Sequence, residues 1–229
     1  MKVLVTGAGS GIGQAIADGL HARGDDLVLL GRNEQRVEDL RGRYAGADVR
    51  VGDLAEYATV DDAVADVDRL DAVVHAAGVL ELGPVADLPV EDLTGQLRVN
   101  LVAPTELTRA LLPALRAARG TVVFLNSGAG LVAHPEWSAY AASKFGLRAV
   151  ADSLRAEEAG AGVRVTSVYL GRIATPMQQK VHEQEGKVYD ERRWIQPETV
   201  AATILHVLDL PPDATIPEVT IRPLVPGPT

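Results

Sequence analysis

The opening segment of this 229-residue chain places the strongest constraint on its fold, because a short apolar run leads directly into a glycine-rich turn. Residues 3–5 have the character of a strand, the turn TGAGSGIG covers residues 6–13, and a stretch with helical period follows. Glycines let the backbone approach a pyrophosphate closely, and the free N–H groups at a helix start favour its charge. This order predicts a dinucleotide-binding loop; a plain strand-to-helix turn rich in glycine is the alternative.

The remainder of the chain alternates short β-rich apolar runs with longer segments of helical period. The predicted strands cover residues 3–5, 27–30, 48–51, 72–75, 121–125, 163–169 and 218–221. The predicted helices cover residues 13–23, 34–43, 57–67, 93–118, 138–159 and 196–208. Pro104 and Pro113 should kink or divide the fourth helix. Repeated strand and helix predict an α/β fold, a doubly wound parallel sheet with helices on both faces, in a single domain spanning residues 1–229.

Charge and cysteine content exclude several kinds of partner and chemistry. The chain carries a net charge of −9 and has no cysteine. It therefore lacks the electrostatic footprint of a protein that binds nucleic acid or a membrane surface, and its catalytic groups must use oxygen and nitrogen. The first apolar stretch is too short for a signal peptide, and no apolar run approaches about 18 residues. We expect a cytoplasmic protein without a metal centre, a nucleic-acid partner or a membrane partner.

The tip of the second predicted strand bears on cofactor choice, because in a dinucleotide site this tip meets the adenosine ribose. No carboxylate lies there to accept hydrogen bonds from a free 2′-hydroxyl, and Arg32 offers a planar, permanently charged group suited to a 2′-phosphate. This favours NADP(H) over NAD(H), which stays open; the alternative for Arg32 is an exposed arginine near a helix start. Asp53, followed by Leu54, is expected near the adenine amino group, at the N-cap of the next helix, or both.

A candidate catalytic pair lies on one predicted helix, where Tyr140 and Lys144 are four residues apart and share a face. A phenol titrates near pH ~10, so it needs a nearby cation to exchange protons near neutrality. Ser127 closes the preceding strand, at the sheet edge where open α/β folds bind ligands, and its hydroxyl can donate to a substrate carbonyl. Asn100 lies in a largely apolar helix and needs a partner there, as a catalytic group, a core amide, or both.

In order and spacing, these motifs resemble those of the short-chain dehydrogenase/reductase family over essentially the whole chain. The matching residues are Thr6-Gly7-x-x-x-Gly11-x-Gly13, Asp53, His75-Ala76-Ala77-Gly78, Asn100, Ser127, Tyr140-x-x-x-Lys144 and residues 171–175. The resemblance implies a Rossmann-type fold with a seven-stranded parallel sheet, and hydride transfer between a nicotinamide and a carbonyl or alcohol carbon. The C-terminal segment is similar to that of the 3-hydroxy acid and serine dehydrogenase branch.

The same resemblance implies roles for individual residues. Tyr140 is the expected general acid for carbonyl reduction and base for alcohol oxidation, Ser127 orients the substrate oxygen, and Lys144 binds the nicotinamide ribose and lowers the pKa of the phenol. Asn100 is expected to hold a water that relays protons through Lys144. The expected cofactor contacts are Gly7, Ser10, Gly11, Ile12, Gly13, Arg32, Asp53, Leu54, Ala76, Ala77, Gly78, Tyr140, Lys144, Gly171, Ile173 and Thr175.

Two places depart from the family pattern. His75 and Ala76 stand where asparagines are common, so an amide that usually ties the centre of the sheet is missing; His75 itself either titrates near neutrality or is structural. Leu170 replaces the usual proline before Gly171, so this turn loses proline's rigidity, although residues 173–175 remain placed to contact the nicotinamide carboxamide.

The predicted substrate loop, residues 172–195, does not identify a substrate. Its basic and acidic side chains are mixed, and its polar part, residues 178–193, is expected to be mobile, as a lid or as disordered surface. Arg172 and the basic residues of the loop (Lys180, Lys187, Arg192 and Arg193) either meet a substrate carboxylate or are solvated.

The leading function is an NADP(H)-dependent carbonyl reductase or alcohol dehydrogenase acting on a small substrate. The family resemblance implies a homodimer or homotetramer formed by the long helices around Asn100 and Tyr140. One alternative is a regulator that senses NADP(H) without turnover, which has no need of the phenol and lysine pair. The other is a 3-oxoacyl-carrier-protein reductase, which needs a basic docking surface that this acidic chain does not offer.

Overall fold

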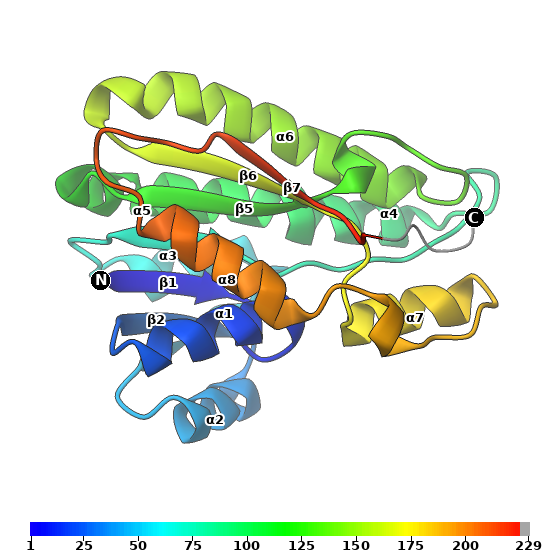
Figure 1. Cartoon of the computed structure of the whole chain (residues 1–229), viewed down its shortest axis with the longest axis horizontal. Coiled ribbons are helices and arrows are strands. Elements are labelled where there is room, and N and C mark those ends of the chain that lie inside the picture. Colours follow the sequence, from blue (N-terminus) through cyan, green and yellow to red (C-terminus); the bar gives the residue numbers. More distant parts are fainter. Residues whose placement is uncertain (225–229) are drawn as a thin grey trace.

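The computed structural model describes residues 1–224, apart from the side chains of residues 57 and 58. Within these residues, seven parallel strands form one sheet in the order β3-β2-β1-β4-β5-β6-β7, which confirms the predicted doubly wound, Rossmann-type sheet (Figure 1). The strands are β1 Lys2–Thr6, β2 Asp26–Gly31, β3 Asp48–Val51, β4 Ala72–His75, β5 Thr121–Ser127, β6 Arg164–Leu170 and β7 Glu218–Ile221. The last five residues of the predicted domain lie outside the described range.

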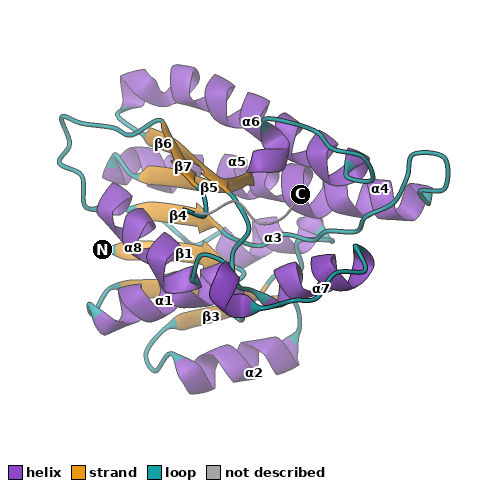
Figure 2. Cartoon of the chain, turned by 45° about the vertical axis from the view of Figure 1, so that its right-hand side comes forward, coloured by secondary structure: helices purple, strands orange, loops and turns teal. Residues whose placement is uncertain are grey.

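Helices cover both faces of the sheet (Figure 2). They are α1 Gly11–Ala22, α2 Glu34–Arg43, α3 Tyr57–Val64, α4 Val90–Leu97, α5 Ala103–Ala118, α6 Ser138–Glu158, α7 Pro176–Gln184 and α8 Pro197–Leu208. Helices α1, α2 and α8 contribute to the core on one face, and α3, α5 and α6 to the core on the other.

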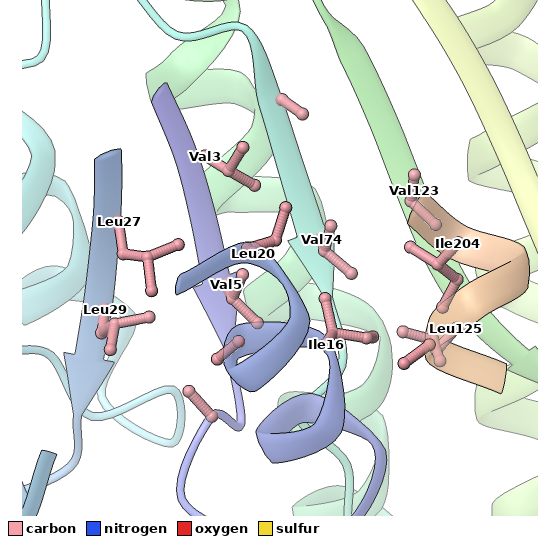
Figure 3. Packing of buried hydrophobic residues seen from close by; sticks show 14 of the residues in the cluster. Val3, Val5, Ile16, Leu20, Leu27, Leu29, Val74, Val123, Leu125 and Ile204 are labelled. Atoms are coloured by element: carbon pink, nitrogen blue, oxygen red, sulfur yellow. The ribbon is translucent and has the colours of Figure 1, made fainter. Parts of the chain in front are cut away.

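Successive side chains of each central strand enter opposite cores, which explains why the strands are apolar throughout. On β1, Val3 and Val5 face α1 and α8, whereas Leu4 faces the core under α5 and α6. Figure 3 shows the first of these cores, in which Ile16 of α1 and Ile204 of α8 lie over the strands. Both faces are therefore closed, and ligands are left with the edges of the sheet.

The long helix predicted over residues 93–118 is divided. Helix α4 ends at Leu97, a π-helical turn spans Arg98–Val102, and α5 begins at Ala103 with Pro104 in its first turn. A helix tolerates proline in its first turn because the N–H it lacks has no partner there. Pro113 lies inside α5 without ending it, so the predicted division occurs at only one of the two prolines.

Helix α7 lies in the polar stretch for which the sequence predicted no helix. Thr175 is its N-cap and accepts a hydrogen bond from the backbone N–H of Gln178 at 3.2 Å, and Pro176 occupies the first turn. These are standard helix-start signals. They were obscured because the helix is mostly polar, with only a narrow buried stripe.

Candidate active site

The candidate residues gather at the carboxyl edge of the sheet, at the right of Figure 1. Thr6 at the end of β1 pairs with His75 at the end of β4, and Ser127 at the end of β5 pairs with Leu170 at the end of β6. Because parallel strands end at the same edge, the loops that follow them converge there.

The loop between β1 and α1 forms a cradle with space only for glycine. Gly7 has φ +73°, and a Cβ on it would lie 2.8 Å from the backbone nitrogen of Ala77; a Cβ on Gly13 would overlap the carbonyl oxygen of Gly7. Ser10 is the N-cap of α1, and its side chain makes no capping hydrogen bond. The first N–H groups of α1 are thus not capped by this side chain, and the cradle fits the pyrophosphate of a dinucleotide.

Two further loops close around this cradle. The backbone N–H groups of Ala76 and Ala77 both donate to Oγ1 of Thr6, at 3.1 and 3.2 Å, which holds the turn after β4 against the end of β1. Gly11 faces Thr175, whose Cγ2 would lie 3.2 Å from a Cβ on that glycine. The remaining predicted cofactor contacts are apolar or backbone positions beside these loops: Ile12 and Ile173 on the core under α1 and α8, Leu54 on the opposite core, and Gly78 and Gly171 after β4 and β6.

At the predicted adenosine end, Arg32 is exposed directly after β2. Arg36, which the sequence reasoning did not select, lies over the glycine loop: its Nη1 would be 2.9 Å from a Cβ on Gly9. Asn33 caps α2, and Arg36 follows three residues later in the first turn. Arg36 could have been selected from the sequence, because the first helical turn after β2 faces the neighbouring glycine loop in this fold.

Asp53 is not the N-cap of the next helix, which corrects one of its two predicted roles. Helix α3 begins four residues later, with Glu56 as its N-cap. Asp53 instead accepts a hydrogen bond from the backbone N–H of Ala55 at 2.9 Å and shapes the turn after β3. The other predicted role of Asp53, a contact with the adenine amino group, stays a prediction.

Tyr140 and Lys144 lie on one face of α6 at the same edge, as their spacing predicts. Tyr140 is 8% exposed and Lys144 is 4% exposed. The ammonium of Lys144 donates to the carbonyl oxygen of Leu125 at 2.9 Å and lies 5.7 Å from the centroid of the Tyr140 ring. Burial lowers the pKa of Lys144 to about 8.

The phenol of Tyr140 differs from the expectation of a lowered pKa. Burial raises its pKa to about 12, and the nearby side chain of Ser127 lowers it only in part. Removing the phenol from water penalises its anion more than the polar side chain of Ser127 stabilises it. In this state the phenol keeps its proton near neutrality, so it is a donor.

A set of buried amides and a hydroxyl holds the catalytic elements together. The side chain of Asn100 accepts from the backbone N–H of Val79 and donates to its carbonyl oxygen, both at 2.9 Å, and donates to Oγ of Ser143 at 3.1 Å. Oγ of Ser143 in turn donates to the carbonyl oxygen of Tyr140 at 2.7 Å. Asn100 is therefore a core amide that ties the turn after β4 to α6, and both of its N–H donors are used.

Asn126, one residue before Ser127, has the corresponding role on the other side of Tyr140. Its amide nitrogen donates to the carbonyl oxygen of Lys144 at 3.1 Å, and its oxygen accepts from the backbone N–H of Ser127 at 2.8 Å. The sequence did not identify Ser143 as a residue that links two elements by hydrogen bonds, because a serine in the middle of a helix does not indicate which group it will bond to.

The position of His75 supports the structural one of its two interpretations. Its ring is stacked on Phe124 with centroids 4.9 Å apart, and Nε2 lies 2.8 Å from Oγ1 of Thr108. Burial lowers its pKa to about 3, with a smaller contribution from the charge of Lys144. The ring is neutral near pH 7 and replaces the missing amide with a hydrogen bond to α5.

Helix α7 lies over Tyr140. Val181 of α7 packs in one buried cluster with Leu80, Ala129 and Tyr140, and Trp137 lies against it. The cluster gives the phenol of Tyr140 apolar surroundings. Of the two alternatives for this loop, a lid or disordered surface, the position of α7 favours the lid.

Two charge contacts hold α7 in this position. Arg172 donates to Glu185 at 2.6 Å, and Lys180 donates to Glu81. The hydrogen bond from Lys180 holds the pKa of Glu81 below its usual range. Gln184 also donates to Glu81, at 2.7 Å. Arg172 and Lys180, which were candidates for a substrate carboxylate, are thus occupied by carboxylates of the chain itself.

Comparison with known proteins agrees with this geometry. The sequence model described as short chain dehydrogenase matches residues 1–186. The chain belongs to the short-chain dehydrogenase/reductase family. An uncharacterized oxidoreductase of Staphylococcus epidermidis is 33% identical, and the match covers 96% of each chain. An uncharacterized short-chain type dehydrogenase/reductase of Sinorhizobium fredii is 32% identical over 96% of this chain and 90% of its own.

Among solved structures, this family member is similar to an alcohol dehydrogenase from the archaeon Thermococcus sibiricus complexed with 5-hydroxy-NADP. The two share 23% of their residues with a TM-score of 0.87, over 100% of this chain and 98% of the other. At this identity the likeness shows the shared fold. Within residues 1–224, every helix of the short-chain dehydrogenase is too short or too polar to span a bilayer.

Proposed function

We propose that this short-chain dehydrogenase/reductase is an NADP(H)-dependent oxidoreductase that interconverts a small carbonyl compound and its alcohol. One observation carries the proposal. The buried phenol of Tyr140 neighbours Ser127, has its ring centroid 5.7 Å from the ammonium of Lys144, and lies at the same sheet edge as the glycine cradle. A proton donor and a dinucleotide site are thus brought together.

The bound nicotinamide supplies the hydride, which carries two electrons to the carbonyl carbon. The chain supplies the proton and the geometry. Tyr140 donates its proton to the carbonyl oxygen as the carbon accepts hydride, and Ser127 donates a hydrogen bond that orients that oxygen. The charge of Lys144 stabilises the resulting phenolate, and its ammonium would hold the nicotinamide ribose when the dinucleotide is bound. A pKa of Tyr140 near 12 keeps the phenol protonated near neutrality, which is the form that donates a proton to a carbonyl oxygen.

The predicted water relay through Asn100 needs one adjustment. Both N–H donors of its amide are used by Val79 and Ser143, while its oxygen accepts from the N–H of Val79. A carbonyl oxygen has a second lone pair. A relay water would therefore donate to this oxygen or to the main chain of Asn100.

The preference for NADP(H) rests on the charge at the adenosine end. The tip of β2 carries Arg32 and no carboxylate, and Arg36 adds a second guanidinium over Gly9. Two guanidinium groups beside the ribose favour a 2′-phosphate over a free hydroxyl. The 5-hydroxy-NADP complex of the archaeal alcohol dehydrogenase is in line with this preference.

Assembly and location remain predictions. The outer face of α5 and α6 carries a shallow groove of mixed character, and the predicted homodimer or homotetramer would use this face. Its lining is apolar at Leu112, Ala149, Val150 and Leu154 and polar or charged at Thr105, Thr108, Arg109, Ser153 and Glu157. A cytoplasmic location rests on composition alone.

The experiment is a panel of ketones, aldehydes, oxo acids, sugars and 3-oxoacyl groups on a carrier protein, incubated with NADPH or NADH while the reduced cofactor's absorbance is followed. We expect turnover of at least one carbonyl class with NADPH, and at least tenfold lower kcat/KM with NADH. Tight NADPH binding without turnover across the panel would support the sensing regulator instead. Turnover restricted to acyl groups on a carrier protein would support the carrier-protein reductase.

A further inference from the structure

Arg222, the first residue after β7, brings a side chain to the carboxyl edge of the sheet, and none of the roles described above involves it. Ile221 at the end of β7 pairs with Leu170, which pairs in turn with Ser127. The backbone N–H of Gly171 donates to the carbonyl oxygen of Ile221 at 2.8 Å. The residue that follows, Arg222, therefore leaves the sheet beside the catalytic serine, where β7 ends next to the segment that follows β6 (Figure 1).

Two glycines allow this residue to approach closely. A Cβ on Gly171 would lie 2.8 Å from Cδ of Pro223, so a side chain there would displace the segment after β7. A Cβ on Gly128 would lie 3.6 Å from both Nη1 and Nη2 of Arg222. The guanidinium thus spreads over Gly128, the residue directly after Ser127.

The same turn contacts the reacting phenol. Gly128 lies between Ser127 and Ala129, and Ala129 packs with Tyr140 in the buried cluster under α7. Consecutive Cα atoms are about 3.8 Å apart. A group bound by Arg222 is therefore within a few bonds of an oxygen held by Ser127 and Tyr140.

Arg222 differs from the basic side chains around α7 in its ion pairs. Arg172 is paired with Glu185, and Lys180 with Glu81. No carboxylate within residues 1–224 forms an ion pair with Arg222, which is exposed. The planar set of N–H donors on its guanidinium matches a planar carboxylate. The cluster around Tyr140 is apolar and suits the uncharged part of a substrate.

We propose that Arg222 is a specificity-determining residue that binds the carboxylate of the substrate, so that the substrate is an oxo acid and the product a hydroxy acid. This rests on the proposed carbonyl reduction at Tyr140. The carbonyl lies against Ser127 and Tyr140, the carbon chain lies under Val181 and Leu80, and the carboxylate meets Arg222 at the mouth.

The test compares acids with uncharged counterparts of the same shape. Straight-chain 2-, 3- and 4-oxo acids and their methyl esters are assayed with NADPH, using the unmodified chain, Arg222→Gln and Arg119→Gln. Arg119 is an exposed arginine between α5 and the start of β5, at the edge of the sheet opposite to Gly128, so its replacement removes the same charge far from the site. Arg222→Lys serves as the conservative variant.

We expect at least one acid to be reduced with a kcat/KM about tenfold or more above that of its ester. Arg222→Gln should lower kcat/KM for that acid about 10- to 100-fold, mainly through KM, and change the ester less than twofold. Arg222→Lys should restore part of the loss, and Arg119→Gln should change neither substrate more than twofold.

Two results would overturn the assignment while leaving carbonyl reduction intact: esters reduced as well as acids by the unmodified chain, or Arg222→Gln lowering both substrates by the same factor. The first means that Arg222 is a solvated surface charge, and the second that its role is structural. Absence of any turnover, including that of neutral ketones, would instead remove the proposed function and this inference with it.

Discussion

The two ends of the proposed cofactor site are built in opposite ways. At the catalytic end the polar groups are buried and bonded to one another: Asn100, Asn126 and Ser143 are each at most 3% exposed. At the adenosine end, Arg32 is exposed and Arg36 is half-buried over a loop of glycines. One end is held by its own hydrogen bonds, and the other offers charge and space to a ligand.

Because the two ends are built differently, substitutions at each end should have different effects on stability and on binding. A buried polar group that loses its partner destabilises the fold as well as disturbing the chemistry. An exposed charge that contacts only the ligand affects binding and leaves the fold unchanged. Changes at the catalytic end should therefore lower kcat and stability together, and changes at the arginines of the adenosine end should raise KM alone.

The largest stability effect is expected from His75 in acid. Its folded pKa of about 3 lies below its ordinary value of 6.5, so between these values the unfolded chain binds a proton that the folded chain does not. Stability is present above pH 6.5 and is lost as the pH falls, by about 3 kcal/mol at pH ~4.5.

Urea unfolding at pH ~7 and ~4.5 measures this loss. His75→Asn should remove about 3 kcal/mol of the difference between the two pH values, whereas His134→Asn, in an exposed loop, should leave it intact. An unchanged difference in His75→Asn would show that His75 does not remain neutral in the folded chain.

The second comparison uses one asparagine from each end. Asn126→Ala leaves the carbonyl oxygen of Lys144 and the N–H of Ser127 without their partner, so we expect a destabilisation of about 2 to 3 kcal/mol and a lower kcat. Asn33→Ala removes the cap of α2, and we expect about 1 kcal/mol with kcat unchanged.

Thermal unfolding and steady-state kinetics distinguish these outcomes. Equal losses of kcat in the two variants would contradict the contrast between the buried and the open end.

The smallest effect on stability is expected from the arginines of the adenosine end. Arg32→Gln and Arg36→Gln should each raise the KM for NADPH about tenfold, leave the KM for NADH within twofold, and leave kcat and the melting temperature unchanged. If Arg36→Gln leaves the KM for NADPH unchanged, Arg36 only covers Gly9 and Arg32 alone reads the 2′-phosphate.

The glycine loop and the alternation of strand and helix were enough to predict the sheet and the edge where the site lies. Both signals are local: apolar strands buried on two faces, and turns that only glycine can form. The bounds of β3, β4 and β7 agree with the prediction, although only β4 is buried throughout; the edge strands β3 and β7 combine exposed residues with less exposed ones.

The features that escaped prediction depend on contacts between distant segments. Helix α7 is polar, and it is held by Val181 on the cluster around Tyr140 and by Lys180 on Glu81. The pKa of Tyr140 moves upward because other elements bury it, which spacing along α6 does not reveal. Arg222 reaches Gly128 only because β7 pairs beside β6.

The most direct test of the central claim is single-turnover oxidation of NADPH by Tyr140→Phe, with the best carbonyl substrate from the panel. The ring and its packing are kept while the proton donor is removed, so we predict a rate about 1000-fold lower with the NADPH dissociation constant within twofold. Tyr169→Phe, a buried tyrosine of β6 whose hydroxyl lies 3.5 Å from Glu218, should retain the full rate. A Tyr140→Phe rate within tenfold of the unmodified chain would contradict the assignment of Tyr140 as the proton donor.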